Sequence, residues 1–213
     1  MNSLESEFQN RASHRRLMAM VPLFTALIII GAWVQVPFPG IPFSLQSFVT
    51  LLAGFLLPRF YALMSVGIYL AIGAIGFPVF AKGAGGLAAF AGPTGGFLFG
   101  FLIQVFLQSY FKSFQAIQRA DPFTRMNLLV GGSIGTLGLF VAGSIGLFFH
   151  LWLGSQFQEP VWPLFLRVGK ALAPFLLPAF LKLAASVWVT EELVSRMSPS
   201  QKETLFSSSN QGF

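Results

Sequence analysis

The sequence predicts an all-α integral membrane protein, a bundle of six transmembrane helices, and three observations support this fold class. Hydrophobic residues make up 54% of the 213 residues and charged residues only 9%, which leaves too little polar surface for a water-soluble globule. Apolar runs of about 20 residues, the length that crosses a hydrocarbon core of roughly 30 Å, recur along most of the chain. Most basic residues lie outside these runs, in the loops and the two tails, as is typical of multispanning proteins.

The charge and cysteine content narrow the function classes. Thirteen Lys and Arg outnumber seven Asp and Glu, and in a multispanning protein this excess reports orientation in the bilayer rather than binding to nucleic acid. The chain has no cysteine, which excludes disulfides, thiol catalysis and cysteine-based metal sites. We therefore expect one membrane domain held by packing in the lipid bilayer, with no nucleic-acid partner, no metal and no cofactor.

The first three helices follow from the apolar runs and the residues that interrupt them. The polar N-terminal segment ends in RASHRR without a small-residue cleavage site, so we expect a cytoplasmic tail and not a signal peptide. A Gly- and Pro-rich loop separates the first helix from the second. The tail is expected at 1–16 and the helices at about 17–36, 45–58 and 61–77.

The last three helices follow a second Gly- and Pro-rich loop, GFPVFAKGAGGLAAFAGPTGGF. Pro in the GPTGG run suits a first helical turn, which places the start of the fourth helix. We expect the sixth helix to be kinked or interrupted, because Pro174 and Pro178 remove backbone donors. The helices are expected at 93–111, 127–153 and 164–190, the membrane domain at 17–192 and a cytoplasmic tail at 193–213.

Basic residues predict the orientation. With six crossings and a cytoplasmic N-terminus, three basic residues lie on the outer side of the membrane: Lys82, Arg167 and Lys170. The cytoplasmic set is larger: Arg11, Arg15, Arg16, Arg59, Lys112, Arg119, Arg125, Arg196 and Lys202. This bias predicts that both termini are cytoplasmic and that both Gly- and Pro-rich loops are external.

Small residues recur at helical spacing inside several spans. Pairs such as Gly67 and Ala71, or Gly96 and Gly100, let two helix backbones approach closely. Further small residues follow at Gly131, Gly135, Gly138, Ala142 and Gly146. We interpret most of them as contacts within the bundle, although some could face a separate membrane subunit.

Lys182 lies well inside the sixth helix. An ionised side chain at mid-bilayer costs at least about 2.5 kcal/mol on insertion scales, so it usually has a partner or a task. Neither the six spans nor the external loops between 37 and 97 contain an Asp or Glu that would neutralise the ammonium. The sequence leaves two interpretations open: a ligand carboxylate pairs with the ammonium, or the side chain extends to the cytoplasmic interface.

The second loop contains a lysine among glycines and ends in the GPTGG run. Lys82 is close to Gly83, Gly85 and Gly86, which permit close backbone approach and unusual dihedral angles, so we expect these residues near an anionic ligand. A solvated loop lysine is the competing interpretation. At 92–96, the free backbone N–H groups and the positive end of the fourth helix can hold a carboxylate or a carbonyl oxygen. Gly95 is therefore a further candidate for binding the ligand. A plain helix start is the alternative interpretation of this run.

Three ordered motifs resemble the BioY family, the biotin-specific substrate-binding (S) components of energy-coupling factor (ECF) transporters. They are IPFSLQ at 41–46, GFPVFAKGAGG at 76–86 and GPTGGF at 92–97, with a weaker match in PFLLPAFLK at 174–182. The resemblance implies a six-helix bundle of the ECF S-component type, in the cytoplasmic (inner) membrane of a prokaryote. It implies high-affinity capture of biotin from outside, with both external loops closing over the ligand. It further implies an ECF module, formed by a membrane coupling protein and two ATPase subunits, as the partner that drives uptake.

Two positions depart from the family pattern. Relatives typically carry an Asp three residues before the lysine of the last helix, where this chain has Ala179, and many carry a small polar residue in place of Lys82. The first departure removes an acceptor for the ureido N–H groups of biotin. The second biases the pocket towards an anion.

Biotin has an apolar bicyclic body, a urea and a carboxylate, which suits a mostly apolar pocket with sparse polar groups. We expect Gln46, Ser44, Tyr69 and Thr94 to donate or accept hydrogen bonds, and Phe80 to supply a flat apolar surface. For Ser44 and Thr94, satisfaction of backbone groups at a helix end explains the residue equally well.

Other functions remain open from the sequence. A solitary facilitator of biotin or a related carboxylate, or a purely structural membrane subunit, has the same composition. An intramembrane enzyme is a weaker alternative, because His14 and His150 are isolated and no Ser has a nearby base. The G-x-x-x-x-G-K-[ST] phosphate loop is missing, so ATP hydrolysis is expected in separate subunits.

Overall fold

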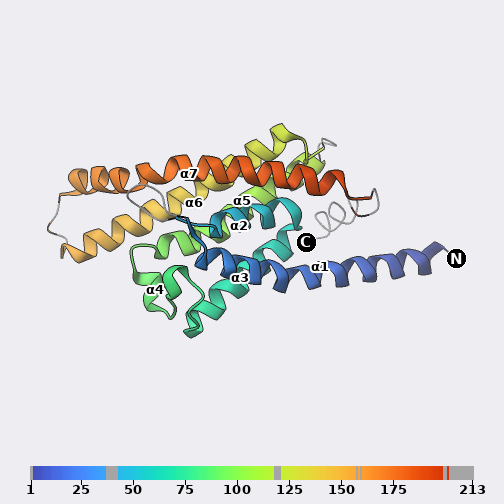
Figure 1. Cartoon of the computed structure of the whole chain (residues 1–213), viewed down its shortest axis with the longest axis horizontal. Coiled ribbons are helices and arrows are strands. Elements are labelled where there is room, and N and C mark those ends of the chain that lie inside the picture. The colour runs from blue at the N-terminus through green and yellow to red at the C-terminus, as the bar shows by residue number, and fades with distance from the viewer. Residues whose placement is uncertain are drawn as a thin grey trace.

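The structure is a computed structural model that describes residues 2–36, 43–117, 121–156, 158, 160–198 and 201. Its framework is a bundle of helices that run back and forth along one axis (Figure 1). Each of the six predicted ranges overlaps one long helix. These are α1 (Asn2–Trp33), α2 (Gln46–Leu56), α3 (Arg59–Ile75), α5 (Gly95–Ile117), α6 (Arg125–Gly154) and α7 (Val161–Ser195).

The helices differ in their capacity to span a bilayer. Within the described residues, four helices are long and apolar enough to cross: α1, α5, α6 and α7. The apolar helices α2 and α3 are shorter, with 11 and 17 residues. The prediction of a helical membrane protein is therefore confirmed, and the count of six crossings stays a prediction.

Two helices differ from the sequence expectations. Helix α1 already begins at Asn2, although the first helix was expected to begin at about residue 17. Residues 2–16 contain no Gly or Pro, so the helix nucleated in the apolar span propagates towards the N-terminus without a breaker. Helix α7 is also continuous through Pro174 and Pro178, so an interrupted sixth helix is wrong, and a kink at these prolines stays a prediction.

Some predicted features lie outside the described residues. These are the central part of the first Gly- and Pro-rich loop at 37–42, Arg119, and the part of the C-terminal tail from 202 onwards, which includes Lys202. The tail expected at 193–213 begins inside α7, which ends at Ser195.

Short elements that carry no sequence periodicity organise the two loops. Strand β1 (Gln35–Val36) pairs antiparallel with β2 (Phe43–Ser44). The second loop contains the 3-10 turn η1 (Ala81–Gly83) and the short helix α4 (Ala88–Ala91). Two side chains fasten this second loop to the bundle: Trp33 Nε1 donates to Pro78 O at 3.2 Å, and His150 Nδ1 lies 2.9 Å from Ala91 O.

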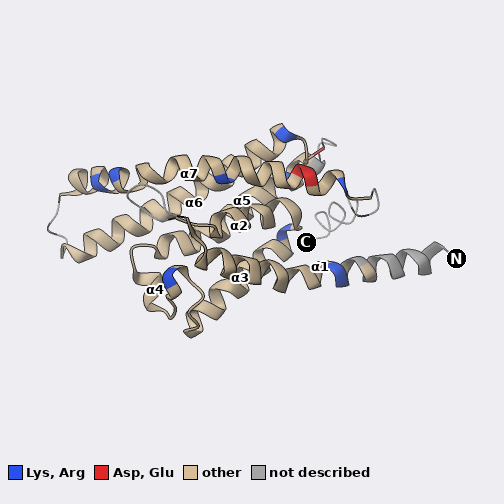
Figure 2. Ribbon diagram, viewed as in Figure 1, with Lys and Arg blue, Asp and Glu red and all other residues tan. Residues whose placement is uncertain are grey.

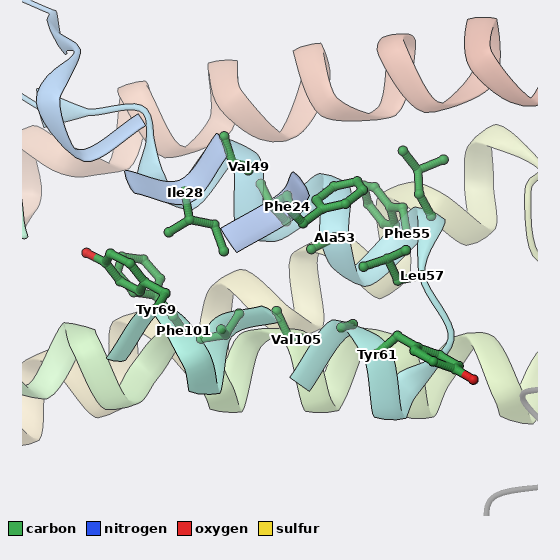
Figure 3. Close-up of a cluster of buried hydrophobic side chains, with 14 of the residues drawn as sticks. Phe24, Ile28, Val49, Ala53, Phe55, Leu57, Tyr61, Tyr69, Phe101 and Val105 are labelled. Atoms are coloured by element: carbon green, nitrogen blue, oxygen red, sulfur yellow. The ribbon is translucent and has the colours of Figure 1, made fainter. Parts of the chain in front are cut away.

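The core lies where α1, α2, α3 and α5 meet (Figure 3). Ile28, Ala53, Tyr69 and Val105 come from these four helices, and each side chain is fully buried. Because lipid is as apolar as these side chains, the close dispersion contacts between them, and not exclusion of water, stabilise the helix packing.

A polar stripe on α5 faces α2, and it corrects the placement of one lysine. Gln104, Gln108 and Lys112 follow at intervals of four residues, which puts them on one helix face. Lys112 was expected in the cytoplasmic loop that follows the helix at 93–111, but it lies inside α5, is buried, and donates to Phe55 O at 3.1 Å and Leu57 O at 2.6 Å. Carbonyl groups at a helix C-terminus lack intrahelical partners, so the ammonium satisfies the end of α2.

Glycines bring α5 and α6 into close contact. A Cβ atom added at Gly146 would lie 2.5 Å from Gly96 Cα, and one added at Gly100 would lie 3.1 Å from Leu139 O. A Cβ at Gly135 would similarly meet Gln104 O at 2.8 Å. These small residues pack within the bundle, as expected. Gly67 is an exception, because a Cβ atom added there would meet no atom of the described residues within 4 Å.

Candidate functional site

A cavity of about 320 Å³ lies between α2, α5, α6, α7 and the two loops. Its volume falls within the range of small-molecule sites, about 300–1,000 Å³. The lining is rich in aromatic side chains: Phe43, Phe80, Phe97, Phe101, Phe140 and Phe175. Nine lining residues have polar or charged side chains: Gln35, Ser44, Gln46, Ser47, Lys82, Thr94, Gln104, Thr136 and Lys182. Such a lining suits a ligand that combines an apolar body with several polar groups.

Lys182 lines the cavity from α7. Its Nζ donates to Ser47 Oγ on α2 at 2.9 Å and lies 4.7 Å from the centroid of the Phe43 ring. Across the described residues, no Asp or Glu carboxylate lies within 4 Å of this ammonium. The side chain therefore points across the bundle to α2, and this direction favours a ligand partner over extension to the cytoplasmic interface.

Lys82 lines the same cavity from the second loop. Its backbone is left-handed, with φ 60° and ψ 25°, and positive φ recurs at Gly83 (71°) and Gly86 (81°). Gly86 N donates to Gly73 O at 2.7 Å, and a Cβ at Gly85 would collide with Phe77 O. None of these three glycines is part of the described lining; they shape the loop that presents Lys82.

A short hydrogen-bonded chain links three of the predicted site residues. Ser44 Oγ donates to Gln46 Oε1 at 3.3 Å, and Gln46 Nε2 donates to Tyr69 Oη at 2.6 Å. Ser44 and Gln46 line the cavity, whereas Tyr69 lies behind them and packs edge-on against Phe80. Tyr69 therefore orients Gln46 and Phe80, and it has no surface in the cavity.

The GPTGG run forms an ordinary helix start. Thr94 lines the cavity, and its backbone oxygen accepts from Phe97 N at 3.0 Å. Gly95 does not belong to the lining, and its N–H donates to Gly92 O at 3.0 Å. A Cβ at Gly95 would collide with Phe90 O, so this glycine permits the close approach of α4 and α5.

The structure adds lining residues that sequence reasoning missed, among them Ser47, Gln104 and Thr136. Gln104 had a usable signal, because an amide inside an apolar span is expensive and usually functional. Thr136 had none, since a hydroxyl on a helix readily bonds to the preceding turn. Ala179, the position at which the resemblance implies an Asp, also lines the cavity, so this departure from the expected pattern lies in the pocket itself.

Comparisons with known proteins show which family this sequence matches. The BioY family matches residues 5–199. The "Biotin transporter BioY" of Thermotoga maritima is 42% identical over 92 residues, which are 43% of this chain and 54% of that relative. The "Probable biotin transporter BioY" of Pyrococcus horikoshii is 31% identical over 180 residues, which are 83% of this chain and 94% of the relative.

A solved structure extends the likeness to the fold. The crystal structure of the S-component for biotin from an ECF-type ABC transporter superposes with a TM-score of 0.71 at 26% identity, covering 91% of this chain and 96% of the other. The family match spans nearly all described helices, and each of the three motifs contributes residues to the lining, among them Phe43, Phe80 and Thr94. This chain belongs to the BioY family.

Proposed function

We propose that this protein captures biotin with high affinity from the outer side of the membrane and delivers it for uptake as the S component of an ATP-driven ECF transporter. The observation that carries the proposal is the aromatic cavity with Lys182, whose ammonium has no carboxylate partner in the described part of the chain. Biotin supplies both an apolar body for the aromatic surface and the missing carboxylate. Lys82, at the loop side, offers a second cation.

The partner in this proposal is an ECF module formed by a membrane coupling protein and two ATPase subunits. This chain is not an enzyme, in agreement with relatives that are named transporters. It also lacks the phosphate-loop motif, so the energy for uptake has to come from other subunits.

Calorimetric titration of the purified protein tests the ligand. We expect saturable heat with biotin and a dissociation constant in the nanomolar range, which corresponds to about 12 kcal/mol of binding free energy. Biotin amide, which lacks the negative charge, is expected to bind more weakly. Absence of saturable binding to biotin would overturn the assignment.

The proposed topology has six crossings, with both termini on the cytoplasmic side of a prokaryotic inner membrane. It is supported by Figure 1, where the first turns of α1 and the last turns of α7 lie at the same end of the bundle. In Figure 2 the acidic residues of α7 lie at that end, and basic residues lie towards both ends.

Single cysteines test this topology, since the chain has none of its own. Ser198 and Gln158 are both exposed and follow opposite ends of the bundle. In intact cells, a membrane-impermeant maleimide is expected to label Gln158→Cys and to spare Ser198→Cys until the cells are opened. The reverse pattern, or equal labelling of both variants, contradicts the proposed orientation.

A further inference from the structure

Two polar side chains that line the cavity carry buried atoms without a hydrogen-bond partner. Gln104 on α5 is fully buried, and its Nε2 has no acceptor among the described residues. The Oγ1 atom of Thr136 on α6 is likewise buried and unpaired in this part of the chain. Buried polar groups in native proteins nearly always have partners, so each unpaired atom beside a cavity calls for one.

The orientation of the Gln104 amide is fixed by α2. Thr50 Oγ1 lies 2.7 Å from Gln104 Oε1 and 3.1 Å from Ser47 O, and its single hydrogen serves the shorter contact. The Gln104 oxygen is thereby occupied, and the amide nitrogen is left as a donor. The site therefore offers N–H groups that fit an oxygen acceptor.

Gln104 and Thr136 are neighbours across the contact between α5 and α6. A Cβ atom added at Gly135 would lie 2.8 Å from Gln104 O and 3.3 Å from Gln104 Cγ. The absence of a side chain at Gly135 thus brings Thr136, the next residue of α6, close to the Gln104 side chain.

Both residues lie at the inner end of the cavity, which we define by Leu51, Gln104, Thr136 and Lys182. Along α5 and α7, Gln104 and Lys182 are the lining residues farthest from the loop that carries Lys82. Helix α6 runs in the opposite direction, and Thr136 is its first lining residue. The Lys182 ammonium bonds to Ser47, and Gln104 bonds to Thr50 one turn further along α2, so these donors face the same region.

We infer that Gln104 Nε2 and Thr136 Oγ1 donate hydrogen bonds to an oxygen of biotin bound at the inner end of the cavity, beside Lys182. This inference rests on the proposed function. The shared chemistry is an oxygen acceptor, which biotin offers both in its ureido carbonyl and in its carboxylate. These two donors and Lys182 together supply hydrogen bonds that a ligand oxygen needs after it leaves water.

The test compares three ligands: biotin, its thiourea analogue, and the alcohol that replaces the carboxylate. Sulfur is a weak acceptor, and the alcohol lacks the anionic oxygens. We expect Gln104→Leu to bind biotin about tenfold more weakly than the wild-type protein does. We also expect the ratio of its affinities for biotin and for one of the two analogues to fall about tenfold, while the ratio for the other analogue stays unchanged. The analogue affected identifies the ureido oxygen or the carboxylate as the acceptor. Thr136→Val, a change of similar volume on another helix, is expected to reduce discrimination against the same analogue.

Gln108→Leu is the matched control, because Gln108 is a buried glutamine one turn away that is not among the lining residues. Its Nε2 donates to Leu51 O and its Oε1 has no described partner, so it shares an unpaired buried atom with Gln104 but lies away from the cavity. It is expected to leave both affinity ratios unchanged. Equal weakening of all three ligands by Gln104→Leu and Thr136→Val, with unchanged ratios, would overturn the inference while biotin binding by the wild-type protein still stands. Failure of the wild-type protein to bind biotin would instead overturn the proposed function.

Discussion

Replacing Lys182 with alanine is expected to weaken biotin binding by roughly 30-fold or more, because truncating one partner of a buried charge pair costs about 2–5 kcal/mol. The ammonium contacts Ser47 Oγ and the Phe43 ring but no described carboxylate, so a bound ligand would supply the opposite charge. Biotin amide keeps the shape of biotin without its charge. Its affinity is therefore expected to change much less, and titration of both ligands measures the difference.

Two lysines serve as comparisons for this result. Lys170→Ala removes an exposed charge from the same helix, outside the cavity lining, and is expected to leave both affinities unchanged. Lys82→Ala removes the cation on the loop side. If Lys82→Ala, and not Lys182→Ala, abolishes the preference for biotin over its amide, the carboxylate lies at the loop and the pairing with Lys182 is wrong.

Gly146→Ala is expected to lower the free energy of unfolding by about 1–3 kcal/mol, the usual cost of overpacking. The added Cβ would lie 2.5 Å from Gly96 Cα and 2.7 Å from Gly96 N. Neither atom belongs to a side chain that could rotate away, so α5 and α6 must separate. Biotin binding is expected to weaken as well, since these helices carry Phe97 and Phe140 of the lining. Thermal unfolding in detergent, with and without biotin, measures both effects.

Gly67→Ala is the control for this substitution. Gly67 also lies inside an apolar helix, but a Cβ there meets no described atom within 4 Å. Because alanine favours the helix by up to about 1 kcal/mol over glycine, the midpoint of unfolding is expected to stay constant or to rise slightly. Equal losses in the two variants would mean that the contact between Gly96 and Gly146 has no special role in stability.

The sequence predicted the helices well because composition and length carry that information directly. An apolar run must satisfy its backbone internally in a bilayer, so it becomes a helix wherever it lies. Helix ends were less well predicted. The start of α1 at Asn2 and the continuity of α7 through Pro174 were missed, since local signals do not show how far neighbouring turns extend a helix.

The candidate site was predicted in part. Lys182, Lys82, Gln46 and Phe80 were named from charge, polarity and motif, and all four line the cavity. Tyr69 and the loop glycines were also named, but they support the lining from behind or shape the loop. Sequence spacing does not distinguish these roles, because it gives the face of one helix and not the helix that this face meets.

The sequence by itself determined the membrane class, the helical segments, the family resemblance and the isolated charge at Lys182, since each depends on composition or on motifs local in the chain. Only the tertiary structure decided which polar groups meet. It buries Lys112 against the end of α2, directs Lys182 to Ser47, and leaves the Gln104 amide nitrogen buried without a described partner. The physical reason is that hydrogen bonds and close packing depend on distances between helices, which are set when glycine contacts such as Gly96 with Gly146 bring the backbones together.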